Sequence, residues 1–185
     1  NQTQLSGGKP EDLDGKLVTF DARKLASSFD SVGFTVDVVK QPKIPDKDLF
    51  IFDTQTDKLV STVDTLGTSL FGLTVDASGN IYVANTDARN HINGKAGTEK
   101  HGLKELGNRP YLNRVSKVSA AGEIDFFQLN PLPPRQPNRK EAVATPFAVK
   151  ASRDGDVLFL TSAGSDVLLA LSVKTGGVVA KAKVG

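Results

Sequence analysis

Side chains that could carry out chemistry are concentrated in residues 85–114. Two histidines there lie near carboxylates and guanidinium groups, a combination that can hold a metal ion or an anionic substrate. The candidate ligand-binding residues are Arg89, Asn90, His91, His101, Arg109, Tyr111 and Arg114. The histidines are ten residues apart, which is no recognised metal-ligand spacing, so an ordered surface loop whose Asn and Asp side chains cap turns is favoured. We therefore expect no metal site here and name no catalytic residue.

Within this stretch, residues 108–114 are interpreted as the anchor that returns the loop to the fold, with Tyr111 packing on its rim. The alternative is that Arg109 and Arg114 face a carboxylate or a phosphate, which the planar guanidinium group binds well.

Two other motifs have structural explanations. Residues 130–137 have PxxP spacing beside an arginine, as in polyproline II ligands, but a stiff connector explains the same prolines. Asp76, Asp154 and Asp156 flank glycine turns and could bind Ca²⁺, although no DxDxDG run is present and turn stabilisation is favoured.

The composition excludes several classes of function. The chain has no cysteine, so it has no disulfide, thiolate metal site, CxxCH haem attachment or cysteine nucleophile. It also lacks a GxSxG elbow, an HExxH helix, a Walker loop and a GxGxxG fingerprint. No run approaches the ~20 apolar residues of a membrane span. The sequence has no methionine, and we expect it to be a processed or excised piece of a longer protein.

The segments that flank these residues are predicted to be β-strands. Short apolar runs rich in Val, Ile, Phe and Thr alternate with tight polar turns, and no stretch of helical length has a 3.6-residue period. The chain also repeats itself. Residues 71–85 align without gaps on 147–161, and residues 50–60 align on 169–179 and, more loosely, on 116–126.

The two alternating hairpins define a four-stranded β-meander. Predicted strands are at about 70–75, 80–85, 114–119 and 123–129 in a middle unit, and at 146–152, 156–162, 167–172 and 178–183 in the last. An earlier unit ends with strands at 49–53 and 58–64, and its first two strands are placed at 16–20 and 33–39. The alternative that 16–30 is itself a third-and-fourth-strand hairpin stays open.

We therefore predict an all-β fold: a β-propeller segment of about three antiparallel blades, at 15–66, 68–129 and 145–185. Closed propellers need roughly four to eight blades, so the segment is incomplete as a ring. The missing blades are expected from residues absent here or from another chain, because terminal blades need a partner.

Three stretches resemble the YVTN-repeat, lactonase-like β-propellers of secreted and surface proteins: the strand 82–85, the turn 52–60 and the closing hairpin 174–179. The likeness covers most of residues 48–185. Residues 85–90, 144–148 and 163–166 are also similar to large secreted bacterial propeller proteins, some of which carry c-type haem domains elsewhere. The resemblance implies a secreted or periplasmic location, and any redox role would come from a domain outside this segment. No cofactor is expected within it.

The predicted register puts the tight turns on one face and the long connections 40–47, 87–112 and 130–144 on the other. In each of these connections cations outnumber anions by two. Long loops on a rigid β scaffold commonly carry function, so we expect a basic face suited to an anionic ligand or a protein partner. Tyr111 is the sole aromatic residue of these loops, which argues against nucleic-acid binding.

The favoured function is a non-enzymatic binding or scaffold module of a larger exported protein. The first alternative is part of a lactonase-like hydrolase or redox enzyme with its site at the central channel mouth. The second is a surface-layer or adhesion protein.

Overall fold

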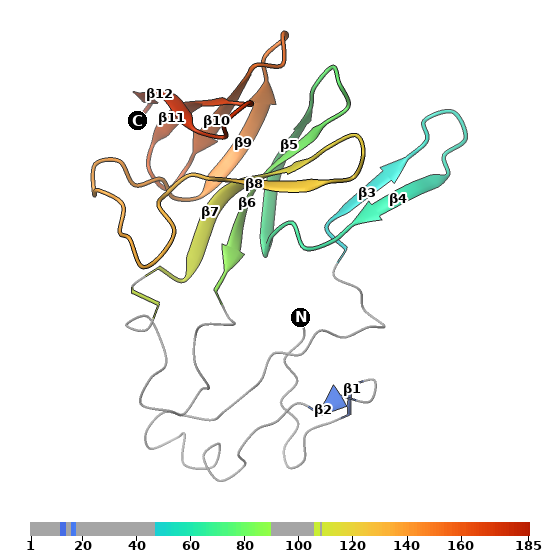
Figure 1. The fold of residues 1–185 in the computed structure, drawn as a ribbon, viewed down its shortest axis with the longest axis horizontal. Coiled ribbons are helices and arrows are strands. Elements are labelled where there is room, and N and C mark those ends of the chain that lie inside the picture. The colour runs from blue at the N-terminus through green and yellow to red at the C-terminus, as the bar shows by residue number, and fades with distance from the viewer. Residues whose placement is uncertain (1–11, 14–15, 18–46, 90–105, 108) are drawn as a thin grey trace. The chain divides into compact units, whose positions relative to one another are not determined.

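The computed structural model describes residues 12–13, 16–17, 47–89, 106–107 and 109–185 (Figure 1). All regular elements in these residues are β-strands, and every strand pair is antiparallel. The strands form two four-stranded and two two-stranded sheets, none of which closes on itself in the described part of the chain. The predicted fold class, an all-β segment of antiparallel blades that is incomplete as a ring, is confirmed.

The chain divides into two compact units, residues 1–64 with 89–110 and residues 65–88 with 111–185. In the first unit β1 (Asp12–Leu13) pairs with β2 (Lys16–Leu17), and β3 (Leu49–Phe52) pairs with β4 (Leu59–Val63). The hairpin β3–β4 was predicted from the repeat. The predicted strand at 33–39, residues 18–20 of the strand at 16–20, and residues 40–46 of the first connection lie outside the described residues.

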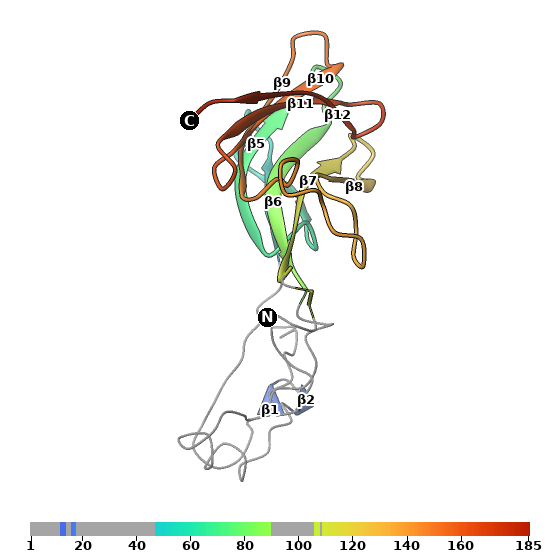
Figure 2. The same cartoon turned by 90° about the vertical axis from the view of Figure 1, so that its left-hand side faces the viewer.

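The second unit holds two consecutive four-stranded meanders. The first contains β5 (Ser69–Val75), β6 (Ile81–Ala88), β7 (Tyr111–Val118) and β8 (Ile124–Gln128). The second contains β9 (Pro146–Ala151), β10 (Val157–Ser162), β11 (Val167–Ser172) and β12 (Val178–Lys183). All eight strands were predicted: β11 and β12 have the predicted bounds, and the ends of the others are displaced by one to three residues. Figure 2, which views the unit from the side, shows the two sheets lying against each other.

The core of this unit lies between its two sheets. The inner face of sheet β5–β8 contributes Tyr82, Ala84, Val115 and Phe127, and that of sheet β9–β12 contributes Val149, Leu158, Leu160, Leu169 and Leu171. The sheets come closest where β5 meets β9. A Cβ on Gly72 would lie 2.6 Å from the carbonyl oxygen of Phe147, so only glycine permits this approach.

The structure corrects the gapless alignment of 71–85 on 147–161. The alignment holds for strand β9 and for the turn glycine, since Gly79 and Gly155 both have a positive φ, 82° and 80°. Strand β10 is shifted by one residue, because Leu73 pairs with Val83 whereas its counterpart Val149 pairs with Leu160. Asp156 is thus an extra residue in the second turn. A one-residue shift reverses the face of every side chain in a strand.

With this correction, equivalent residues of the two sheets point in the same direction. Val83 lies on the outer face of sheet β5–β8, and its equivalent Leu160 lies on the inner face of sheet β9–β12. The inner-face Tyr82 likewise corresponds to the outer-face Phe159. The two sheets therefore stack front to back, and the same relation could add a further blade, as in a propeller.

Turn geometry explains why residues 50–60 match 169–179 closely and 116–126 only loosely. The β3–β4 and β11–β12 turns share two backbone hydrogen bonds: Asp53 N to Lys58 O and Asp57 N to Asp53 O in one, Ser172 N to Gly177 O and Gly176 N to Ser172 O in the other. Both hairpins shift register at the aligned position, after Ile51 and after Ala170. The β7–β8 turn is one residue shorter, with Ser119 N bonded to Glu123 O, and its ladder is regular.

Candidate functional site

The long connection between β6 and β7 begins at Arg89 and ends at Pro110. Arg89 is buried, and its Nη1 donates to the carbonyl oxygens of Leu106 at 2.7 Å and of Arg109 at 2.9 Å. Its backbone N donates to Pro110 O at 2.9 Å. This side chain therefore joins the two ends of the connection. Burial, and then the neighbouring charge of Arg89, lower the pKa of Arg109.

Arg114 lies in the other unit, at the centre of a buried polar network on the outer face of sheet β5–β8. Its Nε donates to Asn85 Oδ1 at 3.2 Å and its Nη2 to Leu66 O at 2.9 Å. Its Nη1 lies 3.1 Å from the Asp87 carboxylate, and the guanidinium stacks 4.0 Å above the ring of Phe126. The carboxylate partner envisaged from the sequence is thus present within the chain itself.

Asn85 and Ser116 complete this network. Asn85 Nδ2 donates to Ser116 Oγ and to Val83 O, both at 2.8 Å, and Ser116 Oγ donates to Leu66 O at 2.8 Å. A Cβ on Gly67 would lie 2.5 Å from Asn85 Oδ1, so the segment before β5 rests directly on the amide. The network ties that segment to two strands of its sheet.

The remaining predicted site residues are divided. Tyr111 is half-exposed at the start of β7. Asn90, His91 and His101 lie outside the described residues. The structure therefore brings Arg89 and Arg109 together in one unit, and places Tyr111 and Arg114 on one strand of the other.

The connection between β8 and β9 was predicted as a long basic loop at 130–144. Its ends are held by Asn130, whose Nδ2 donates to Val143 O at 2.7 Å and whose Oδ1 accepts from Val143 N at 2.9 Å. Asn113, near the start of β7, accepts from Leu129 N through its carbonyl at 3.0 Å and from Thr145 N through its side chain at 2.9 Å. Both ends of this connection are thus fixed to the same end of sheet β5–β8.

Inside this connection the proline-rich segment turns. Arg135 N donates to Leu132 O at 3.1 Å, whereas a polyproline II helix has no internal hydrogen bond. The peptide bond between Pro133 and Pro134 is cis. The connector interpretation of residues 130–137 therefore describes this segment better than a continuous polyproline II ligand.

A cavity of about 380 Å³ opens between this connection and the outer strands of sheet β9–β12. Its lining is Leu129, Asn130, Pro131, Pro137, Asn138, Glu141, Val143, Leu169, Val178 and Lys181. No sequence motif indicated this cavity, because its walls come from segments that are far apart in the chain.

The aspartates that flank glycine turns act within those turns. Asp76 accepts hydrogen bonds from Ser78 N, from the backbone and side chain of Asn80 and from Tyr82 Oη. Burial raises the pKa of Asp76, but these hydrogen bonds outweigh it and the net shift is downward. Asp154 accepts from the Ser152 hydroxyl and from Asp156 N. In the described part of the chain, no three His, Cys, Asp or Glu side chains gather where they could hold a metal ion.

Comparison with known proteins bears on the fold. No protein-family profile matches the chain, and no curated protein matches its sequence. Among solved structures it is similar to hydrazine synthase of Kuenenia stuttgartiensis, a protein that contains a β-propeller, with a TM-score of 0.56 and 14% identity. This likeness supports a β-propeller-type module. The match covers 84% of this chain and 44% of that chain, so the segment spans under half of its structural neighbour.

The likeness concerns the fold alone at this identity, and membership of the YVTN-repeat family stays a prediction. No helix in the described ranges is long and apolar enough to span a membrane.

Proposed function

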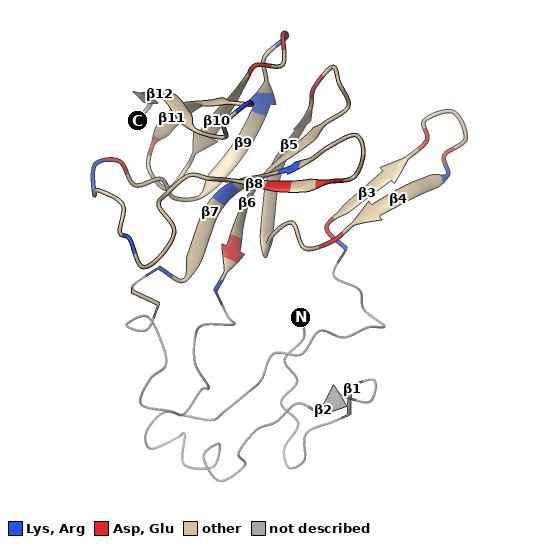
Figure 3. Cartoon of the chain, in the orientation of Figure 1, with Lys and Arg blue, Asp and Glu red and all other residues tan. Residues whose placement is uncertain are grey.

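We propose that this chain is a binding module: a propeller segment of a larger exported protein that presents basic connections to an anionic ligand or to an acidic surface of a partner domain. The observation that carries the proposal is the connection 130–144, which is fixed at both ends and projects cations from one end of a rigid sheet pair. Figure 3 shows the charged segments of this connection between β8 and β9.

The charges of the connection support the proposal. Arg135, Arg139 and Lys140 are exposed and stand against one carboxylate, Glu141. The Asn130 clamp and the Asn113 hydrogen bonds limit the conformational freedom of the loop, which reduces the entropy lost when a partner binds. The tight turns lie at the opposite end of the same sheets. The negative charges of Asp76, Glu123 and Asp154 there repel anions.

The test is retention of the full chain on a heparin matrix, a polyanion, as salt is raised. The variant R135Q/R139Q/K140Q is compared with K150Q/R153Q/K174Q, which removes three cations from the tight-turn end and has the same net charge. We expect the connection variant to bind roughly tenfold more weakly at low salt, while the control keeps wild-type retention. Equal loss in both variants would show that net charge alone governs binding and would overturn the proposal.

A further inference from the structure

The cavity beneath the connection between β8 and β9 has the size and lining of a small-molecule site. Ligand pockets commonly enclose about 300–1,000 Å³, and this one encloses about 380 Å³. Its floor is formed by Leu129, Val143 and Leu169, all buried members of the hydrophobic core. Val178 of β12 forms a wall and is 45% exposed. Contact with an apolar body would therefore remove existing apolar surface from water.

The walls of the cavity are held in place without a ligand. The Asn130 side chain forms two hydrogen bonds with the backbone of Val143, which hold the first and last parts of the connection together. Pro131 and Pro137 add restricted backbone to the same walls. A ligand would thus enter a largely formed site.

The rim is polar and carries one ammonium group, that of Lys181, and one carboxylate, that of Glu141. Lys181 Nζ donates to the carbonyl oxygen of Lys140 at 3.2 Å, which fixes the ammonium at the mouth. An ammonium has three N–H groups, so this hydrogen bond leaves donors for a further acceptor. Glu141 is the carboxylate of the lining, and Arg139 and Lys140 precede it in the chain.

We propose that this cavity binds a small amphipathic anion, with an apolar body on the floor of Leu129, Val143 and Leu169 and a carboxylate accepting hydrogen bonds from Lys181. This inference rests on the proposed binding function and names a ligand class for it. The negative charge of Glu141 at the rim repels the carboxylate of such a ligand. Removing this charge should therefore strengthen the binding of an anion.

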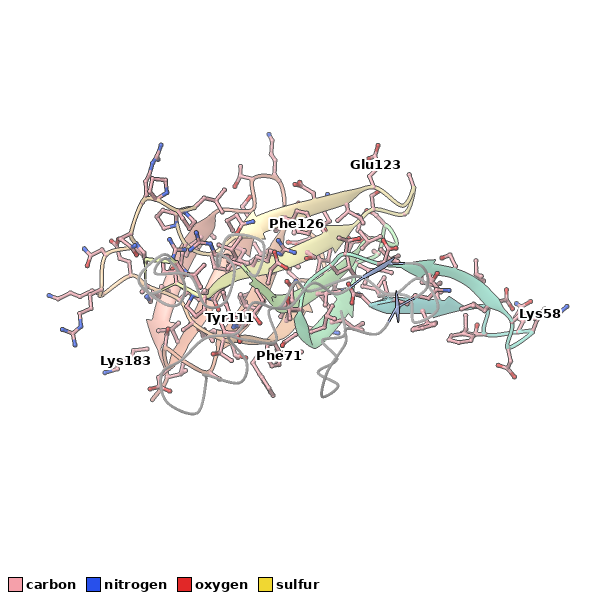
Figure 4. All side chains as sticks on the ribbon, turned by 90° about the horizontal axis from the view of Figure 1, so that it is seen from below. Lys58, Phe71, Tyr111, Glu123, Phe126 and Lys183 are labelled. Atoms are coloured by element: carbon pink, nitrogen blue, oxygen red, sulfur yellow. The ribbon has the colours of Figure 1, made fainter. Side chains whose placement is uncertain are left out.

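The probe is octanoate, titrated calorimetrically into the full chain, with octanol and octylamine as neutral and cationic probes of the same length. Octanoate is expected to bind most tightly and octylamine most weakly. K181Q should weaken octanoate binding roughly threefold to tenfold and leave octanol unchanged, and E141Q should strengthen octanoate binding. K183Q is the matched control. Lys183, labelled in Figure 4, is two residues after Lys181 on the same face of β12 and does not line the cavity.

V178W should fill the cavity and abolish octanoate binding without lowering Tm, because Val178 is at the surface. Equal binding of octanoate and octylamine, or equal effects of K181Q and K183Q, would overturn the assignment. Heparin retention should be unchanged in V178W. If octanoate binds no better than octylamine but heparin retention still depends on the cations of the connection 130–144, the cavity proposal alone is wrong. If heparin retention does not depend on those cations, the proposed binding function is wrong.

Discussion

The guanidinium of Arg114 finds its partners within its own unit: a carboxylate, an amide, a carbonyl and an aromatic ring. In the second sheet the equivalent residue is Val167, and the equivalent of Ser116 is Leu169, both in the apolar core. Sheet β5–β8 thus has a polar network where its neighbour has hydrophobic packing. Such a network stabilises the fold only while every member keeps its partner.

Arg114→Met should lower the free energy of unfolding by about 3 kcal/mol, because it leaves the Asp87 carboxylate and the Leu66 carbonyl without their cation. Arg153→Met, in an exposed turn, should cost less than about 0.5 kcal/mol. Denaturant unfolding of the two variants measures the difference. Similar small losses would show that Arg114 is not a structural cross-link.

Tyr82 provides a pH-dependent probe of the inter-sheet core. Burial, and then the hydrogen bond and negative charge of Asp76, raise the pKa of Tyr82 to about 12 from 10.0. Because the folded-state value is the higher one, the stability from this phenol is complete below pH 10 and is lost as pH rises toward about 12.

Ultraviolet titration of the Tyr111→Phe variant, which leaves Tyr82 as its sole tyrosine, should show a midpoint near 12 while the chain remains folded. Adding Asp76→Asn should move this midpoint down. A midpoint near 10.0 in the folded protein would contradict the hydrogen bond from Tyr82 to Asp76.

At the scale of elements, the register of β10 decides which face of the second sheet enters the core. Leu158 and Leu160 lie inside and Phe159 lies outside, although the β9–β10 turn contains the extra residue Asp156. The β5–β6 turn reaches the equivalent pairing without that residue. The turn therefore absorbs the insertion and the strand keeps its faces.

Deleting Asp156 should consequently be tolerated, since the remaining residues match the length of the β5–β6 turn. The expected cost is about 1 kcal/mol, from loss of the Val173 N to Asp156 O hydrogen bond. Deleting Phe159 instead moves either Leu158 or Leu160 from the core to the outer face, even if the turn shortens by one residue, and should cost about 3 kcal/mol or more. Circular dichroism and thermal unfolding distinguish the two; equal tolerance would contradict the assigned register.

In the molecule as a whole, both outer faces of the sheet pair expose large apolar side chains. Leu73 and Val75 on one sheet are 56% and 53% exposed, and Phe159 on the other is 45% exposed. Figure 4 labels Phe126, which shares its face with Leu73. The repeat indicates that such faces are covered in a complete propeller, because the equivalent inner faces are covered here.

The isolated chain should therefore associate through these faces as its concentration rises, an effect that sedimentation velocity can measure. Phe159→Lys should reduce association without lowering Tm. Leu132→Lys, which changes an exposed leucine in the connection between β8 and β9, serves as control and should have no effect. If the two variants sediment alike, the outer face of sheet β9–β12 does not drive association.

The strands, the turns and the repeat could be predicted from the amino-acid sequence, because they depend on local features. Alternating apolar residues specify a strand, and Gly79 and Gly155 mark turns that need a positive φ. The sequence also singled out Arg89, Arg109 and Arg114 as cations near a long connection. It missed Ser116, although the departure of this residue from the repeat, where the equivalent position is Leu169, was a usable signal.

Three features became clear only from the packing of the strands: the buried face of β10, the partners of Arg114 and the cavity beside β12. Each depends on contacts between distant positions: Arg114 and Leu66 are 48 residues apart, and the cavity joins residue 129 to residue 181. The closure of one connection by Asn130, for example, forms such contacts while leaving the strand pattern unchanged. Local preferences fix the elements, and packing between elements fixes their faces and the surfaces available for binding.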